Sequence, residues 1–272
     1  MNNEDTVIGF IGAGNMATAL ISGLIIGGLD PKKIIASSPE EEHLELLSKE
    51  FGIRTSEDNK EIIEISNTVI LAVKPNIIRS VLTQLSDLIS PQKHLIISIA
   101  AGVTIQDIQE PLGPNQRIVR AMPNTPASIQ RGVTALCQND CSTLADKELT
   151  EYVFKSVSSI CWLKESSLDL YTALIGSGPA YIFYIIEALL EASKDLDYDK
   201  NKLKDLIIEM IVGSAELAKQ SSDAPHILRK KVTSPGGVTE KALEVFKKNK
   251  IKDSIVDAIN QAKERSIDLG GK

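Results

Sequence analysis

Residues 6–17 read TVIGFIGAGNMA, a short apolar run that passes through glycines into a helix-forming stretch. Gly12, Gly14 and Ala17 have the spacing of the dinucleotide-binding fingerprint, in its variant with alanine third. Gly12 permits a tight turn, Gly14 lets a pyrophosphate approach the backbone, and Ala17 keeps the helix close to the sheet. The phosphates would then lie on the helix N-terminus. The loop supplies these cofactor-binding candidates: Gly12, Ala13, Gly14, Asn15, Met16 and Ala17.

The pattern around this loop predicts an α/β fold. Short β-rich runs recur through the first half of the chain, with helix-compatible segments between most of them. Such alternation, with nearly continuous apolar strands, indicates a doubly wound, Rossmann-like parallel sheet covered on both faces. The expected strands are 6–12, 32–37, 67–73, 94–100, 117–122, 132–137 and 158–163. The expected helices are 15–29, 40–51, 58–65, 76–89 and 143–157.

After Glu165 the pattern changes to helices alone. Helical periodicity runs through 168–194, 200–220, 224–231, 236–248 and 251–267. We therefore expect two domains, a dinucleotide-binding Rossmann domain at 1–165 and an all-α domain at 166–272. The density of apolar helices favours a homodimer or a larger oligomer of dimers, and a self-contained bundle is the alternative.

Composition narrows the class of protein. The 272 residues carry a net charge of −6 without a basic run, which argues against a nucleic-acid partner. Three cysteines make no disulfide framework and favour a reducing compartment such as the cytoplasm. Cys137 and Cys141 have no nearby histidine to complete a metal set. The uncharged run at 171–186 is short and is interrupted by Gly-Ser-Gly-Pro, so we expect a buried helix rather than a membrane span.

The end of the second expected strand bears on which dinucleotide binds. NAD enzymes usually place a carboxylate there, on the ribose 2′-hydroxyl. This strand ends instead in Ser37 and Ser38, whose hydroxyls can donate to a 2′-phosphate. We predict NADPH as the cofactor. No arginine stands in this loop, which leaves NADH open as a second cofactor.

Further candidates follow the later strands, because ligands bind at the carboxyl ends of the strands in such sheets. Lys74 either faces the cofactor phosphates or is a solvated lysine before a helix. Small residues at 100–102 leave room for a flat ring. Asn124 either pairs with a carboxamide or orients its own loop. The candidates at these strand ends are Ala72, Val73, Lys74, Pro75, Ala100, Ala101 and Asn124.

Taken in order, these landmarks resemble the pyrroline-5-carboxylate reductase family over nearly the whole chain. The motifs that carry the resemblance are the 12–17 loop, SSP at 37–39, Asn59, AVKP at 72–75, AAG at 100–102, NTP at 124–126, GSGPAY at 176–181 and SPGGVT at 234–239. The last two are the most specific. The resemblance implies a Rossmann domain, a helical dimerisation domain and NADPH-dependent reduction of 1-pyrroline-5-carboxylate to L-proline. It also makes Asn59 a cofactor-binding residue.

The SPGGVT motif suggests where such a substrate would bind. Ser234 is predicted as an N-cap and Pro235 as the first helical residue. Gly236 and Gly237 then leave the first helical turn bare, and a bare helix N-terminus binds anions such as the substrate carboxylate. The resemblance implies that the Thr239 hydroxyl contacts the ring nitrogen, which makes Thr239 the predicted catalytic residue. The substrate-binding candidates are Glu165, Ser234, Gly236, Gly237, Val238 and Thr239. For Glu165, the alternative is a surface acid that caps the next helix.

Three departures from the family pattern leave substrate preference open: Ala173, Ile175 and Lys231. Reduction of a six-membered cyclic imine is therefore an alternative function. A β-hydroxyacid dehydrogenase is disfavoured because the helix from Pro179 has no lysine before Lys194. A non-catalytic dinucleotide-binding regulator is the remaining alternative, and the retained Thr239 argues against it.

Overall fold

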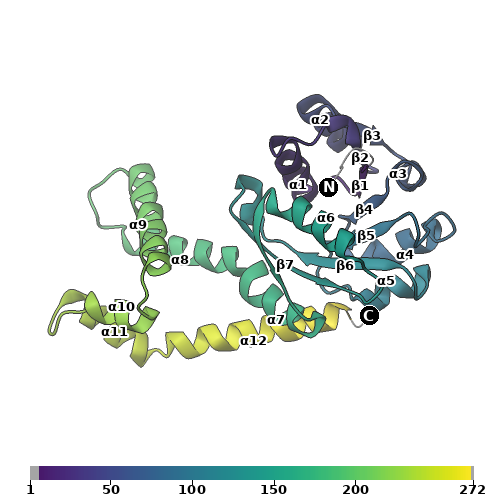
Figure 1. Cartoon of the computed structure of the whole chain (residues 1–272). Helices are drawn as coiled ribbons and strands as arrows, with labels where there is room; N and C mark the ends of the chain where they lie inside the picture. Colours follow the sequence, from purple (N-terminus) through teal and green to yellow (C-terminus); the bar gives the residue numbers. More distant parts are fainter. Residues whose placement is uncertain (1–5, 271–272) are drawn as a thin grey trace. The chain divides into compact units, whose positions relative to one another are not determined.

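The computed structural model describes residues 6–270 (Figure 1). The chain forms two compact units. The first contains the described residues up to Ser177 and those from Ala262 to Gly270, and the second is Gly178–Gln261. The units therefore divide the chain later than the sequence boundary at Glu165. The reason is that Leu168 and Tyr171, although helical, are buried in the core of the first unit.

The first unit is built on an eight-stranded sheet with the order β3-β2-β1-β4-β5-β6-β7-β8. Neighbouring strands are parallel except β6 and β7, which are antiparallel. The expected parallel sheet therefore forms with one antiparallel pair of strands. A single 3-10 helix, η3 (Thr125–Ile129), joins β6 to β7, and so short a link permits only a reversal of direction. The strands are β1 (Ile8–Ile11), β2 (Ile34–Ser37), β3 (Arg54–Ser56), β4 (Thr68–Leu71), β5 (Leu95–Ser98), β6 (Arg117–Met122), β7 (Gly132–Gln138) and β8 (Ser158–Trp162).

Helices cover both faces of this sheet, as the sequence predicts (Figure 1). One buried apolar cluster joins the sheet to α1 (Asn15–Ile26), α2 (Glu41–Phe51) and α6 (Leu144–Lys155). A second cluster joins the opposite face to α3 (Asn59–Ile65), α4 (Pro75–Leu85), α5 (Ile105–Leu112) and α7 (Leu168–Tyr171). Strands β1, β2, β4 and β5 are buried along their whole length, which is why they read as unbroken apolar runs.

Two elements of this unit were not expected. Strand β3 is three residues long, polar and only partly buried, so no apolar run marks it. Helix α5 contains Pro111, which reads as a helix breaker. It forms nevertheless, because Thr104 and Asp107 make a capping box at its start and Ile105 and Ile108 are buried.

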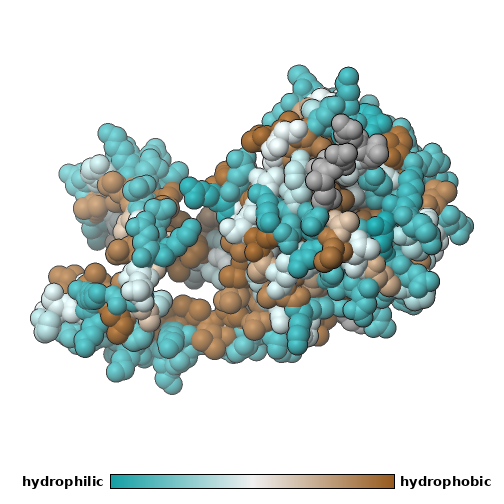
Figure 2. Space-filling model, in the orientation of Figure 1, coloured by the Kyte–Doolittle hydropathy of each residue, from teal (hydrophilic) through white to brown (hydrophobic). Residues whose placement is uncertain are grey.

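The second half of the chain is helical in the described residues after Ser167, as predicted. A π-helical turn at Thr172–Gly176 follows α7 and precedes α8. The remaining helices are α8 (Gly178–Ala192), α9 (Lys200–Gln220), α10 (Pro225–Lys231), α11 (Val238–Lys248) and α12 (Ile251–Gly270). None of the residues in α8 to α11 is buried, so the expectation of a buried helix over 171–186 is wrong from Gly178 onward in the single chain. Figure 2 shows the resulting apolar side chains on the surface of the helical part.

Candidate active site

The loop between β1 and α1 has the geometry that binds a pyrophosphate. Gly12 has a φ of +106°, and a Cβ there would lie 2.6 Å from the carbonyl oxygen of Ala72, so only glycine fits. Gly14 is the N-cap of α1, and a Cβ there would meet no atom within 4 Å. No side chain caps this helix. Its first N–H groups therefore have no side-chain partner, as an anion-binding helix start requires.

The other cofactor candidates follow neighbouring strands at the same edge of the sheet. Ile11 is paired in register with Ser37 on one side and Leu71 on the other, and Leu71 is paired with Ser98. The loops that follow β1, β2, β4 and β5 thus emerge side by side. Lys74 is the N-cap of α4 and is exposed. The structure brings together at one edge the residues predicted from motifs far apart in the sequence.

Ser37 is fully buried, which changes its expected role. Its hydroxyl lies 2.6 Å from Asn59 Oδ1 and 3.3 Å from the carbonyl oxygen of Phe10. It orients the first residue of α3 rather than facing solvent. The neighbouring Ser38 hydroxyl accepts a hydrogen bond from the backbone N–H of Glu40 at 3.1 Å. A contact of the Ser37 side chain with a nucleotide would have to replace its hydrogen bond to Asn59. The same hydrogen bond fixes the Asn59 side chain, whose contact with a nucleotide stays a prediction.

Asn124 is also committed to partners within the chain. Its Oδ1 accepts from the backbone N–H of Val133 at 2.8 Å, and its Nδ2 donates to the carbonyl of Ile175 at 3.3 Å. The residue is 7% exposed. These bonds favour the alternative in which Asn124 orients its loop, because both ends of its amide tie that loop to β7 and to the π-helical turn. Sequence alone could not separate this role from a carboxamide contact.

The Glu165 carboxylate holds structural partners too. Its Oε1 accepts from Arg120 Nη1 at 2.6 Å and from the backbone N–H of Ile105 at 2.7 Å. The Arg120 side chain is 8% exposed, so the guanidinium has little other access to solvent. Glu165 thereby links the start of α5 to β6. Glu165 is therefore not the free surface acid given as the alternative, and a substrate contact stays a prediction.

The three departures from the family pattern have different settings. Ala173 is buried, and Ile175 packs against one of the core clusters of the first unit. Both lie in the π-helical turn, whose Gly176 would place a Cβ 3.0 Å from Met122 Cε. Lys231 ends α10 and makes an ion pair with Asp223. The first two substitutions therefore act on packing, and only Lys231 adds an exposed charge.

The SPGG segment differs from its prediction. Helix α11 begins at Val238 with Gly237 as its N-cap, not at Pro235 with Ser234 as the cap. Gly236 has a φ of +70°, which an α-helix does not allow, and the N–H of Gly237 donates to the carbonyl of Ser234 at 3.0 Å. Ser234 to Gly237 therefore form a turn of the type with proline second and glycine third.

The corrected start still leaves an anion-binding geometry. No side chain caps α11 at Gly237, and Val238 and Thr239 are exposed in its first turn. Sequence reasoning missed Glu240, whose Oε2 accepts from the backbone N–H of Gly236 at 2.7 Å. A carboxylate of the chain itself thus lies where a substrate carboxylate is expected. The signal was an acidic residue at the third helical position, which commonly reaches back to a free N–H.

Of the three histidines, His94 is buried and structural. Its Nδ1 accepts from the N–H of Ser90 at 2.8 Å, and its Nε2 lies 3.0 Å from the carbonyl of Ile63. Burial is the main reason that the pKa of His94 is lowered from its ordinary value. Burial likewise raises the pKa of the Cys137 thiol to about 11, so it is an inert thiol at neutral pH. Within residues 6–270, no group of histidine, cysteine and acidic side chains could hold a metal ion.

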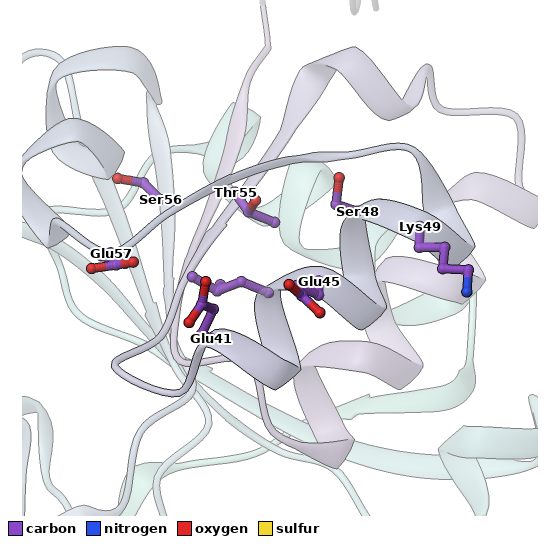
Figure 3. Close-up of a pocket in the computed structure, with 8 residues that line it drawn as sticks. Glu41, Glu45, Ser48, Lys49, Thr55, Ser56 and Glu57 are labelled. Atoms are coloured by element: carbon purple, nitrogen blue, oxygen red, sulfur yellow. The ribbon is translucent and has the colours of Figure 1, made fainter.

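A hollow of about 550 Å³ lies between α2 and β3, beside the ends of β2 and β3 (Figure 3). Its lining includes three glutamates, Glu41, Glu45 and Glu57. A phosphate would be repelled by these carboxylates. The hollow is therefore not a site for the cofactor phosphates.

Comparisons with known proteins agree with the order of these motifs. Residues 165–269 match the family model for pyrroline-5-carboxylate reductase dimerisation, and residues 7–102 match the model for coenzyme F420-dependent NADP oxidoreductases. A pyrroline-5-carboxylate reductase of Pseudomonas aeruginosa is 36% identical over 263 residues, which cover 96% of each chain.

Solved structures give the same result. A pyrroline-5-carboxylate reductase from Coxiella burnetii has a TM-score of 0.89 and 38% identity, covering 98% of this chain and 100% of the other. The Plasmodium falciparum pyrroline carboxylate reductase, solved with NADP bound, has a TM-score of 0.90 and 30% identity, covering 98% and 99%.

Proposed function

The chain belongs to the pyrroline-5-carboxylate reductase family, and from this premise we propose that it reduces 1-pyrroline-5-carboxylate to L-proline with NADPH. The observation that carries the proposal is identity to a reductase of this name over almost the full length of both chains. The match includes the helical segment, which a dinucleotide-binding domain alone would lack. It is an oxidoreductase of the NADP-dependent kind.

The cofactor half of the reaction is assigned to the carboxyl edge of the sheet. When bound, NADPH supplies the hydride that reduces the C=N bond. The N-terminus of α1 holds the pyrophosphate on its N–H groups, with Gly14 allowing close approach. Asn59, oriented by Ser37, contacts the adenosine end. The remaining contacts come from the candidates at 72–75 and 100–101.

The substrate half is assigned to the turn before α11. The first N–H groups of the helix hold the substrate carboxylate, because they have no partner within the helix and the helix dipole favours an anion. Thr239 is exposed in the same turn, and its hydroxyl donates a hydrogen bond to the ring nitrogen. This bond favours the developing amine, and water supplies the proton that completes it at the nitrogen. The chain contributes chiefly by fixing the positions of the two reactants.

We propose further that the protein is a homodimer or a larger oligomer of dimers. Helix α8 carries exposed apolar side chains, such as Phe183 (57% exposed) and Tyr184 (73%), and none of its residues is buried. Exposed apolar patches of this kind usually mark protein interfaces. The segment Glu165–Ala192 is long and apolar enough to cross a membrane by length and composition. This segment lies inside the match to the dimerisation model. We therefore infer that a second copy of the chain, and not a membrane, covers its apolar side chains.

A location in the cytoplasm stays part of this proposal. It is supported by the three free cysteines, none of which pairs with another, and by the use of a reduced cofactor.

A direct test is the oxidation of NADPH, followed by its absorbance, with 1-pyrroline-5-carboxylate as substrate. A six-membered cyclic imine acid is the matched control, since it differs by one ring carbon. Rapid oxidation with the five-membered ring alone supports the proposed substrate. Oxidation with the six-membered ring alone would replace it by the alternative that Ala173, Ile175 and Lys231 left open. NADPH binding without oxidation by either imine would favour the regulator.

A further inference from the structure

The chain leaves the first unit after Ser177 and returns to it at Ala262. Within the first unit, a hydrogen bond joins the segment before the exit, α7, to the returning helix, α12. The hydroxyl of Ser266, in α12, donates to Asp169 Oδ1, in α7, at 2.7 Å. Ser266 is 5% exposed, so this hydrogen bond is shielded from water. The last turns of α12 are therefore fixed on the first unit.

The returning helix ends on the turn that follows β5. Gly102 in this turn has a φ of +77°, and a Cβ there would lie 3.2 Å from the carbonyl oxygen of Ser266 and from Leu269 Cβ. A Cβ on Gly270 would overlap the carbonyl oxygen of Gly102. The two backbones thus pack directly against each other, and neither glycine has room for a side chain.

A second segment holds the same turn from its other end. The N–H of Ile105, the first residue of α5, donates to the Glu165 carboxylate at 2.7 Å. That carboxylate is fixed in turn by Arg120. Residues 100–105, which connect β5 to α5, thus contact two segments distant in the sequence. These are Glu165, which follows β8, and the end of α12.

This turn lies on the nicotinamide side of the cofactor site. The glycine loop after β1 binds the pyrophosphate, and the adenosine end lies toward β2. The nicotinamide end consequently extends toward β4 and β5, on the other side of β1 in the sheet. We propose that the last turn of α12, Ser266 to Gly270, is a positioning element for the nicotinamide half of the cofactor. The inference rests on the proposed use of NADPH.

The test compares two ligands by calorimetric titration. NADPH carries the nicotinamide, and 2′-phospho-ADP-ribose lacks it. In Gly270→Ala the added methyl group must displace the 100–102 turn, so we expect NADPH to bind about tenfold more weakly. The fragment should keep its affinity to within about twofold, because its contacts lie toward β2. Leu144→Ala is the control, since Leu144 lies in the first unit and is 80% exposed.

Ser266→Ala is a milder variant that removes the bond to Asp169 without adding atoms. It decides the matter if Gly270→Ala does not fold, as judged by circular dichroism. Equal losses for both ligands would overturn the proposal, because they indicate a general loss of structure. Unchanged NADPH binding in the folded variants would overturn it as well. No imine is present in these titrations, so the result does not depend on which imine the enzyme reduces.

Discussion

The two units of this chain bury their apolar residues in opposite ways. In the first unit, strands such as β1 are buried along their whole length between helices. In the second unit, α8 is largely apolar, yet none of its residues is buried, and neither is any residue of α9. The first unit thus completes its core within one chain. The comparison teaches that the second needs a further surface, which we assign to another copy of the chain.

The strongest test makes the same substitution in both units. Phe183→Glu places a charge on the exposed apolar face of α8, and Leu144→Glu does so on α6, where Leu144 is 80% exposed. We expect Phe183→Glu to prevent oligomerisation, because an unpaired charge is costly to bury in an interface. We expect kcat/KM to fall more than about a hundredfold, because the turn assigned to the substrate belongs to the same helical unit as α8 and depends on its packing. Leu144→Glu should leave both unchanged. Light scattering and steady-state kinetics measure the two effects, and a fully active oligomer of Phe183→Glu would contradict the assigned interface.

The next test concerns chemistry in the helical unit. Thr239→Ala removes the hydroxyl expected to contact the ring nitrogen, and we expect kcat to fall about tenfold without abolishing activity. Thr239→Ser, which keeps a hydroxyl, should retain most of the rate. Thr239 is exposed, so neither change should alter the melting temperature. Turnover by Thr239→Ala at the wild-type rate would remove this side chain from the mechanism.

A smaller effect is expected from the neighbouring carboxylate. Glu240 accepts from the Gly236 N–H, in the region assigned to the substrate carboxylate. Glu240→Gln removes the negative charge, so we expect the KM for the imine acid to fall about threefold, with kcat little changed. Glu244→Gln is the control, because Glu244 lies on the same helix and pairs with Lys241. An unchanged or higher KM in Glu240→Gln would show that the two carboxylates do not compete.

The smallest effect belongs to the first unit and concerns pH. The pKa of His94 is lowered in the folded chain, so the unfolded chain binds the additional proton first as pH falls. Stability should therefore decrease as pH drops below the ordinary histidine value of about 6.5 toward the lower folded pKa. The free energy of unfolding measured in urea at neutral and mildly acidic pH tests this. In His94→Gln that part of the pH dependence should vanish; its persistence would assign it to other groups.

The fold was largely predictable from sequence because its strongest signals are local. The glycine spacing at 12–17 and the apolar runs of the buried strands each follow from neighbouring residues. The antiparallel β7 was not predictable, because strand direction depends on how η3 connects it to β6. Strand β3 was missed because its side chains are polar and give no strand signal. It forms through backbone hydrogen bonds to β2.

In the candidate site, too, features set by neighbouring residues were predictable and contacts between distant residues were not. Gly12 and Gly14 have the geometry predicted for them, because a tight turn and a helix start are local events. For Asn124 and Glu165 the sequence left both a ligand contact and another role open, and in the structure their polar atoms meet residues distant in the chain, such as Ile175 and Arg120. A polar residue in a motif does not reveal whether its partner is a ligand or the protein.

The class of fold, the cofactor loop and the family follow from the sequence, because periodicity, turn residues and motif order are properties of the chain. Which motif residues are bonded to distant parts of the chain is visible only in the folded structure. It also showed the end of α12 packed against the turn after β5, a contact between Gly102 and Gly270. Such contacts depend on the path of the whole backbone, since the residues that meet are brought together only when the core forms.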